Sequence, residues 1–108
     1  SIIIDLEQDT EIEKIKVYWR GLAYSKNYLI MLSKDKKKWE LAEKNIDALK
    51  GIQMLSESGD PVFMNEISIN KSGRYVRLWI PQNSDFYCKH NHWNYVQIFE
   101  IEIINNKF

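Results

Sequence analysis

Aromatic, amide and imidazole side chains crowd into residues 85–95 of this sequence. An aromatic face can stack on the apolar face of a pyranose ring, while planar amides donate to and accept from its hydroxyl groups. This mixture predicts recognition of a neutral sugar, although it also suits a membrane interface. The alternative for Trp93 and Tyr95 is that their rings cover the end of a hydrophobic core. The candidate ligand contacts in this segment are Phe86, Tyr87, His90, His92, Trp93 and Asn94.

Two histidines in the same segment also suggest a metal site. His90 and His92 lie two residues apart, so on a strand both rings would share one face, and Cys88 or Asp85 could complete a set of zinc ligands. The chain has no further histidine or cysteine. Exposed loop histidines are therefore the favoured interpretation.

The remaining polar residues do not predict catalysis. The carboxylate pairs Glu57/Asp60 and Glu100/Glu102 lie in turn or strand contexts that are typical of a solvated surface. No glycine-rich loop of the kind that cradles phosphate is present. We therefore expect a binding protein and not an enzyme.

The totals of the sequence narrow the class of protein. Its 108 residues suit a single domain, and 44% hydrophobic residues can build one core. Fifteen basic residues balance fifteen acidic ones, so the basic excess typical of nucleic-acid binding is missing and no nucleic acid is expected as a partner. The single cysteine excludes an internal disulfide but leaves the compartment open. No apolar run approaches the roughly 18 residues that span a bilayer.

Short apolar or alternating runs, separated by turn residues, predict an all-β fold. Offset faces in the last run predict a bulge near Phe99 and Glu100. Residues 42–49 are ambiguous and could form one or two helical turns, with Ile46 and Leu49 on one face. The first run is expected to be a buried strand. The expected strands cover residues 2–6, 12–19, 28–33, 39–41, 62–64, 67–69, 74–80 and 96–104.

Four segments carry a resemblance to a known family. They are Ile4-Asp5-Leu6, Tyr28-x-Ile30-x-x-Ser33-x-Asp35-x-x-x-Trp39, Arg74-Tyr75-Val76-Arg77-Leu78 and Glu100-Ile101-Glu102-Ile103. In this order they resemble the discoidin domains, also called coagulation factor V/VIII type C domains. The carbohydrate-binding modules of family 32 belong to the same galactose-binding-like superfamily. The resemblance implies one domain over residues 1–108, a jelly-roll β-sandwich of about eight antiparallel strands.

Domains of this kind bind ligands with loops at one end of the sandwich. The resemblance places such loops at residues 19–27, 51–65 and 82–95. In family-32 modules the first tends to carry a polar hydrogen-bonding residue, the second Arg and Asn, and the third a stacking aromatic. The histidine often used for galactose is missing here, and the second loop has no arginine, so the sugar stays open. The candidates in the first two loops are Trp19, Arg20, Tyr24, Gln53, Glu57 and Asn65.

The resemblance also implies a structural calcium ion. The family normally has more chain before its Ile-Asp-Leu segment, including a loop that helps to hold this ion, so the sequence is expected to be a piece of a longer protein. Glu100 matches an acidic residue at the other end of that site. A calcium cage needs about 6–8 oxygen ligands, and one carboxylate does not provide it. Glu100 is therefore the one candidate calcium ligand, and no other cofactor is predicted.

Two positions depart from the family pattern at turns. The glycine that usually follows Asp35 is replaced by Lys36, and the glycine that usually follows Leu6 is replaced by Glu7. The turn after Asp35 could therefore differ in type. The carboxylate of Asp35 itself is expected to accept hydrogen bonds from nearby backbone N–H groups.

Two arginines of the strand at residues 74–80 are expected to have mainly structural roles. Arg74 and Arg77 lie three residues apart, so they face opposite sides of a strand. We expect one of them to pair with a carboxylate such as Asp5 or Glu102.

Taken together, the sequence predicts a non-catalytic carbohydrate-binding module, attached to a glycan-processing enzyme or a surface protein. The alternative is a protein-interaction or lipid-interface module of the same fold. Most domains that resemble this one act outside cells, which implies an extracellular or cell-surface location.

Overall fold

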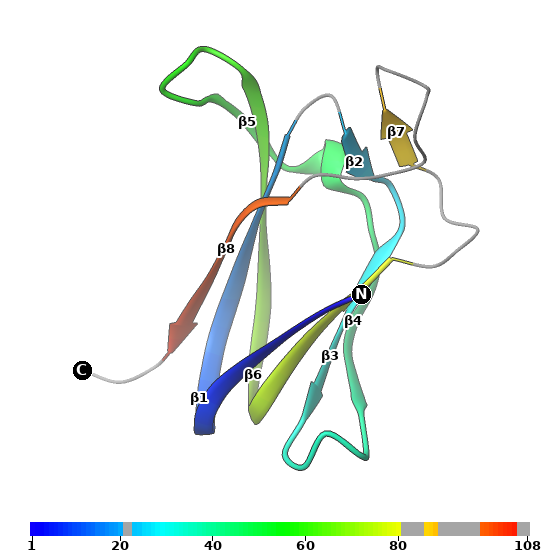
Figure 1. Cartoon of the computed structure of the whole chain (residues 1–108), viewed down its shortest axis with the longest axis vertical. Helices are drawn as coiled ribbons and strands as arrows, with labels where there is room; N and C mark the ends of the chain where they lie inside the picture. Colours follow the sequence, from blue (N-terminus) through cyan, green and yellow to red (C-terminus); the bar gives the residue numbers. More distant parts are fainter. Residues whose placement is uncertain (21–22, 81–85, 89–97, 106–108) are drawn as a thin grey trace.

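The structure is a computed structural model of the chain, and it describes residues 1–20, 23–80, 86–88 and 98–105. These residues form eight strands and one 3₁₀ helix, and they include no α-helix. The elements, drawn in Figure 1, are β1 (Ile2–Arg20), β2 (Ala23–Ser25), β3 (Tyr28–Ser33), β4 (Glu40–Ile46), η1 (Ala48–Lys50), β5 (Ile52–Leu55), β6 (Pro61–Trp79), β7 (Phe86–Cys88) and β8 (Ile98–Asn105).

Six strands form one antiparallel sheet in the order β4-β3-β6-β1-β8, with β5 also paired to β6. The first part of β1 pairs with the last part of β6, and this part of β6 also pairs with β3. The rest of β1 pairs with the first part of β6 and with β8, while β5 pairs with the start of β6. The two long strands therefore belong to two layers, and both turn sharply at the bottom of Figure 1. The chain is an all-β antiparallel sandwich, as the sequence predicts.

An irregularity in the pairing of β1 with β6 bends the sheet, so that each of these strands passes from one layer to the other. Between the pairs Asp5↔Tyr75 and Thr10↔Gly73, β1 advances by five residues while β6 advances by two. Glu7 in this stretch has a φ angle of 71°, the left-handed conformation that glycine adopts at lowest cost. Extra residues in one strand interrupt the pleat and bend it. Glu7 thus keeps a conformation suited to the glycine that the family usually has there.

One hydrophobic core fills the space between the layers. It contains side chains from β1, β3 and β6, so it depends on both layers. Trp19 of β1 and Tyr28 of β3 belong to different layers, and their ring centroids lie 4.8 Å apart. Large aromatic side chains bury about 150–250 Å² each, so this contact contributes strongly to joining the two layers. The largest fully buried side chains are Trp19, Tyr28, Ile12, Ile15, Ile30, Leu78, Val17 and Val76.

The strand boundaries differ from the sequence prediction in two ways. The segments expected at residues 2–6 and 12–19 are one continuous strand, and those at 62–64, 67–69 and 74–80 form another. Turn residues between them bend the strand without ending it. The start of β1 is also less buried than expected, because Ile2 and Ile3 are 40% and 42% exposed.

Two further predictions concern local structure. The expected helical turns at 42–49 are wrong for the most part, because residues 42–46 belong to β4 and the 3₁₀ turn covers Ala48–Lys50. The residues of β4 are exposed or only partly buried, and in such a strand the spacing of apolar residues is a weak signal. The bulge expected near Phe99 is confirmed: Tyr18 pairs with Glu100 and Trp19 with Ile98, which leaves Phe99 as the extra residue.

The turn between β3 and β4 confirms the role predicted for Asp35. Its Oδ1 atom accepts hydrogen bonds from the backbone N–H groups of Lys37 and Lys38, at 2.8 and 3.0 Å. These bonds hold the pKa of Asp35 below its usual value. Lys36 has a φ angle of 69°, so the turn keeps a left-handed residue although glycine is replaced.

Candidate functional site

The described parts of the three loops predicted to bind ligand are residues 19–20, 23–27, 51–65 and 86–88, and they lie at one end of the sandwich, shown at the top of Figure 1. We call this the loop end and define it as β2, η1, the β5–β6 hairpin and β7. Strand β7 pairs with β2, where Tyr24 lies opposite Tyr87 and Ser25 opposite Phe86. The ring of Tyr24 also contacts Phe63 of β6, with centroids 5.7 Å apart. Segments distant in sequence thus form one surface.

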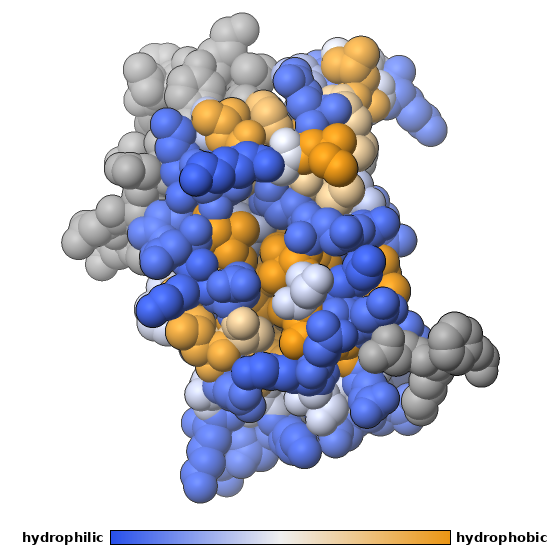
Figure 2. Space-filling model, turned by 180° about the vertical axis from the view of Figure 1, so that it is seen from behind, coloured by the Kyte–Doolittle hydropathy of each residue, from blue (hydrophilic) through white to orange (hydrophobic). Residues whose placement is uncertain are grey.

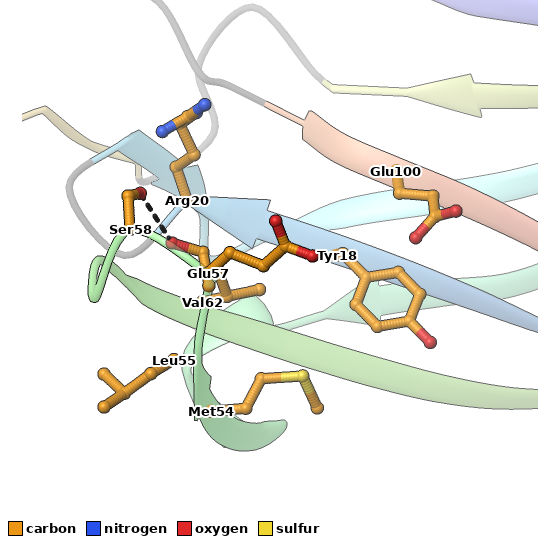
Figure 3. A pocket seen from close by; sticks show the side chains of 9 residues that line it. Tyr18, Arg20, Met54, Leu55, Glu57, Ser58, Val62 and Glu100 are labelled. Carbon is orange, nitrogen blue, oxygen red and sulfur yellow. Dashed lines mark hydrogen bonds between the residues drawn. The ribbon is translucent and has the colours of Figure 1, made fainter.

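A hollow of about 540 Å³ opens beside the loop end, on the outer side of one layer (Figure 3). This volume falls within the roughly 300–1,000 Å³ of typical small-ligand sites. Strand β1, the β5–β6 hairpin and β8 each contribute to its wall. Its lining residues are Tyr18, Arg20, Met54, Leu55, Ser56, Glu57, Ser58, Val62 and Glu100.

Tyr18 presents an aromatic ring to this hollow. It lies opposite Met64 of β6 and Glu100 of β8, so its side chain has a neighbour on each side. Its hydroxyl group donates a hydrogen bond to Glu102 Oε1 at 3.2 Å. Partial burial and the neighbouring negative charges, first that of Glu102, raise the pKa of Tyr18 above its usual value. The phenol therefore stays protonated and acts as a hydrogen-bonding group.

Charged side chains surround the apolar part of the hollow. Arg20 Nη1 lies 3.8 Å from Asp60 Oδ2 across the base of the β5–β6 hairpin. Glu57 and Glu100 are both exposed. In Figure 3 the side chain of Glu57 extends from the hairpin toward Tyr18, and Glu100 lies on the other side of Tyr18. The arrangement combines hydrogen-bond donors and acceptors with apolar contact area, which suits a polar ligand that has one apolar face.

A buried polar cluster supports the base of the loop end. Tyr28 donates its hydroxyl proton to Asn65 Oδ1 at 2.5 Å, and Asn65 Nδ2 donates to the carbonyl of Ala48 at 3.0 Å. A Cβ atom on Gly51 would collide with Asn65 Nδ2 and the Met64 carbonyl, so this close approach requires glycine. Burial raises the pKa of Tyr28. The cluster ties β3, η1 and β6 together beneath the hairpin.

Some predicted ligand contacts lie in the interior. Trp19 is fully buried against Tyr28, and Asn65 is 5% exposed with both ends of its amide bonded inside the protein. Tyr24 is 7% exposed. A residue adjacent to a loop in sequence can still point into the core, because side chains of a strand alternate between its faces. We therefore leave Trp19 and Asn65 out of the proposed contacts.

The other predicted contacts divide into two groups. The backbones of Phe86 and Tyr87 lie in β7 beside β2, which puts them at the loop end. Arg20 lines the hollow. The remaining candidates fall outside the described residues, and they are His90, His92, Trp93 and Asn94.

The described residues do not fit a calcium cage or a zinc site. Glu100 is exposed and lines the hollow with Glu57, but no group of three or more His, Cys, Asp or Glu side chains in the described ranges lies close enough to hold a metal ion. Calcium needs about 6–8 oxygen ligands, far more than these two carboxylates supply. The zinc candidates His90 and His92 lie outside the described residues.

Several lining residues were missed at the level of sequence. Tyr18 alternates with Val17 and Trp19, a pattern that predicts a solvated strand face and not a site. Met54 and Leu55 follow Ile52 in a short apolar run just before the turn at Ser56–Asp60. Apolar residues next to a tight turn are exposed unless another element covers them. This run was the available signal for the hairpin side of the hollow.

The part of the chain that the structure describes has no helix long and apolar enough to cross a bilayer. A comparison with curated proteins finds no match. The profile of the F5/8 type C domain family matches residues 1–101, which is almost the whole chain. Domains of this family are generally non-catalytic binding modules, and they typically occur in extracellular or surface proteins. The chain belongs to the F5/8 type C, or discoidin, domain family.

Proposed function

We propose that this chain is a non-catalytic, extracellular module that binds a glycan in the hollow and at the adjoining loop end. The observation that carries the proposal is the composition of the hollow. The ring of Tyr18 and the exposed apolar side chains of Met54 and Leu55 offer surface to the carbon face of a sugar. Arg20 and the carboxylate of Glu57 can donate to and accept from its hydroxyl groups.

The aromatic and amide residues at 86–94 extend this proposed surface. Pairing of β7 with β2 puts the backbone of residues 86–88 at the loop end, which supports this extension. Phe86, Tyr87, His90, His92, Trp93 and Asn94 therefore remain proposed contacts. We further propose that the module is an appendage of a glycan-processing enzyme or a surface protein.

Binding to a panel of immobilised glycans, followed by titration calorimetry, tests the proposal. Tyr18→Ala removes the aromatic surface of the hollow, and we expect it to lower the affinity for the tightest-binding glycan by about fivefold to tenfold. Tyr75→Ala is the matched control, since Tyr75 lies far from the hollow, in the pair with Asp5. Trp93→Ala tests the contribution of the segment 86–94. Failure of every glycan to bind, or an unchanged affinity in Tyr18→Ala, would contradict glycan binding at the hollow.

A lipid interface is the second candidate, and the β5–β6 hairpin favours it. Ile52 and Leu55 are 62% and 70% exposed, unusually high values for large apolar side chains. Hydrophobic residues reach the surface at the upper right of Figure 2, where this hairpin projects. Sedimentation with phosphatidylcholine vesicles checks this candidate. If the hairpin inserts, the double variant Ile52→Ser/Leu55→Ser will lose sedimentation while Leu41→Ser, an exposed leucine on β4, will keep it.

A further inference from the structure

The charge of the hollow is predominantly negative. Its lining includes two carboxylates, Glu57 and Glu100, and one guanidinium, Arg20. The guanidinium lies 3.8 Å from Asp60, so much of its positive field is compensated locally. A third carboxylate, that of Glu102, lies two residues beyond Glu100 on β8 and accepts the hydrogen bond of Tyr18.

Two lysines of β1 among the described residues on this face are paired with a carboxylate. Lys14 and Lys16 of β1 lie 3.7 and 3.8 Å from Glu66 Oε1, and they share that single carboxylate. Glu66 is therefore neutralised, whereas Glu57 and Glu100 have no ion pair among the contacts of the described residues. Within the part of the chain that the structure describes, no cation competes with a ligand for these two carboxylates.

The ring of Tyr18 adds a second attraction for positive charge. An ammonium group within about 6 Å of the face of an aromatic ring is attracted by the quadrupole of that ring. Glu57 and Glu100 lie on opposite sides of Tyr18 in Figure 3. Partial burial, and after it the charges of Glu102, Glu100 and Glu66, raise the pKa of the phenol. Ring and carboxylates would thus act on the same cationic group.

The rest of the hollow limits what can carry that cation. Met54 and Leu55, which are 36% and 70% exposed, form an apolar wall backed by the buried Val62. The volume of about 540 Å³ accommodates one or two pyranose rings. An isolated metal ion would make no contact with this apolar wall. The ligand must combine an ammonium group with an apolar face and hydroxyl groups.

We propose that the hollow selects glycans that carry a protonated amine, namely amino sugars whose nitrogen is not acetylated. This inference rests on the proposed function, because it names the class of glycan that binds in the same hollow. The ammonium lies near Tyr18 between Glu57 and Glu100, and the carbon face of the sugar lies against the apolar wall. Acidic sugars and anionic lipid headgroups bind poorly, since both carboxylates repel them.

The test compares two oligosaccharides that differ in one group. Affinity for a glucosamine oligomer and for the same oligomer fully N-acetylated is measured by titration calorimetry. Exposed ammonium–carboxylate pairs and one cation–π contact predict a preference of about fivefold to tenfold for the free amine. Glu57→Gln and Glu100→Gln keep the shape of the side chain, and each is expected to reduce this preference about two- to fivefold.

Controls separate charge from shape. Glu43→Gln removes an exposed carboxylate on β4, in the other layer, and should leave the preference unchanged. Raising NaCl from about 0.05 M to about 1 M should weaken binding of the glucosamine oligomer, because salt screens charge–charge interactions. Binding of the acetylated oligomer should hardly change.

Each outcome bears on the two proposals differently. Tighter binding of the amine, lost in Glu57→Gln or Glu100→Gln, supports the inference. Equal binding of both oligomers, or tighter binding of the acetylated one, overturns the inference and leaves glycan binding standing. Binding of neither oligomer, with no other glycan bound, overturns both. Binding of a lysine-rich peptide in preference to the glucosamine oligomer also overturns the inference, because the cation would then come from a protein.

Discussion

The two ends of the sandwich use their polar and apolar groups in opposite ways. At the end opposite the loop end, which we call the turn end, charged groups pair with one another: Arg74 Nε and Nη2 contact the two carboxylate oxygens of Asp5 at 2.9 and 3.1 Å, and Lys71 lies 2.7 Å from Glu40. At the loop end and in the adjoining hollow, Arg20 pairs with Asp60, but Leu55 faces solvent, and Glu57 and Glu100 have no ion pair among the described residues. Charged side chains that pair with one another stabilise the fold, whereas charged side chains without such a partner are available to a ligand.

The pairing predicted for the strand arginines is confirmed for one of them at the turn end. Arg74 takes Asp5, which was one of the two expected carboxylates. Arg77 instead packs against aromatic rings on the outside of the sheet, with its Cζ 4.4 Å from the ring centroid of Trp79 and 5.6 Å from that of Trp39. The guanidinium can use the faces of indole rings as partners.

The largest expected effect is a loss of stability on truncating a buried tryptophan beneath the loop end, compared with truncating an exposed one. Trp19→Ala removes the aromatic contact between the two layers, and we expect it to lower the free energy of unfolding by about 3–5 kcal/mol. Trp79→Ala, which truncates a tryptophan that is 40% exposed, should cost far less. Urea denaturation measures both. If Trp19→Ala does not fold, Trp19→Phe should show the same direction with a smaller loss. Equal losses for Trp19→Ala and Trp79→Ala would contradict the structural role.

A smaller effect concerns strain at the turn end. Lys36 holds a left-handed backbone, so Lys36→Gly should raise the free energy of unfolding by about 0.5–1 kcal/mol. Lys37→Gly removes the same charge from a position that is not left-handed, and it should lower stability. Glycan affinity should stay the same in both variants, because the turn lies at the opposite end. A loss of stability in Lys36→Gly would show that the turn is not strained.

The smallest effect is the pH dependence of the turn end. The hydrogen bonds from Arg74 and from the Glu7 backbone lower the pKa of Asp5. Its contribution is therefore present above the unfolded pKa of about 3.9 and is lost as the pH falls through the lower folded pKa. Asp5→Asn should be less stable than the parent chain at pH 7, and the difference should vanish in strong acid. Urea midpoints at several pH values measure it, and a difference that grows toward low pH would contradict the pairing.

Local patterns in the sequence predict part of the fold, namely the features that depend on residues close together along the chain. Alternation identified most strands, and the carboxylate of Asp35 marked a turn whose bonds are all within three residues. The joining of short runs into β1 and β6 was missed, because a bulge such as that after Asp5 reads as a loop in sequence. The site was accessible only in part: Arg20 was expected, but Tyr18 was not.

The sequence by itself determined which residues form strands and turns and which family the chain resembles, because these depend on spacing along the chain. The tertiary structure decided that described segments of three distant loops meet at one end, since β2–β7 pairing and the Asn65 cluster join residues far apart in sequence. It also decided that Trp19 faces the core while its neighbour Tyr18 faces the hollow. Which face of a strand is covered depends on the layer packed against it, and no local pattern contains that information.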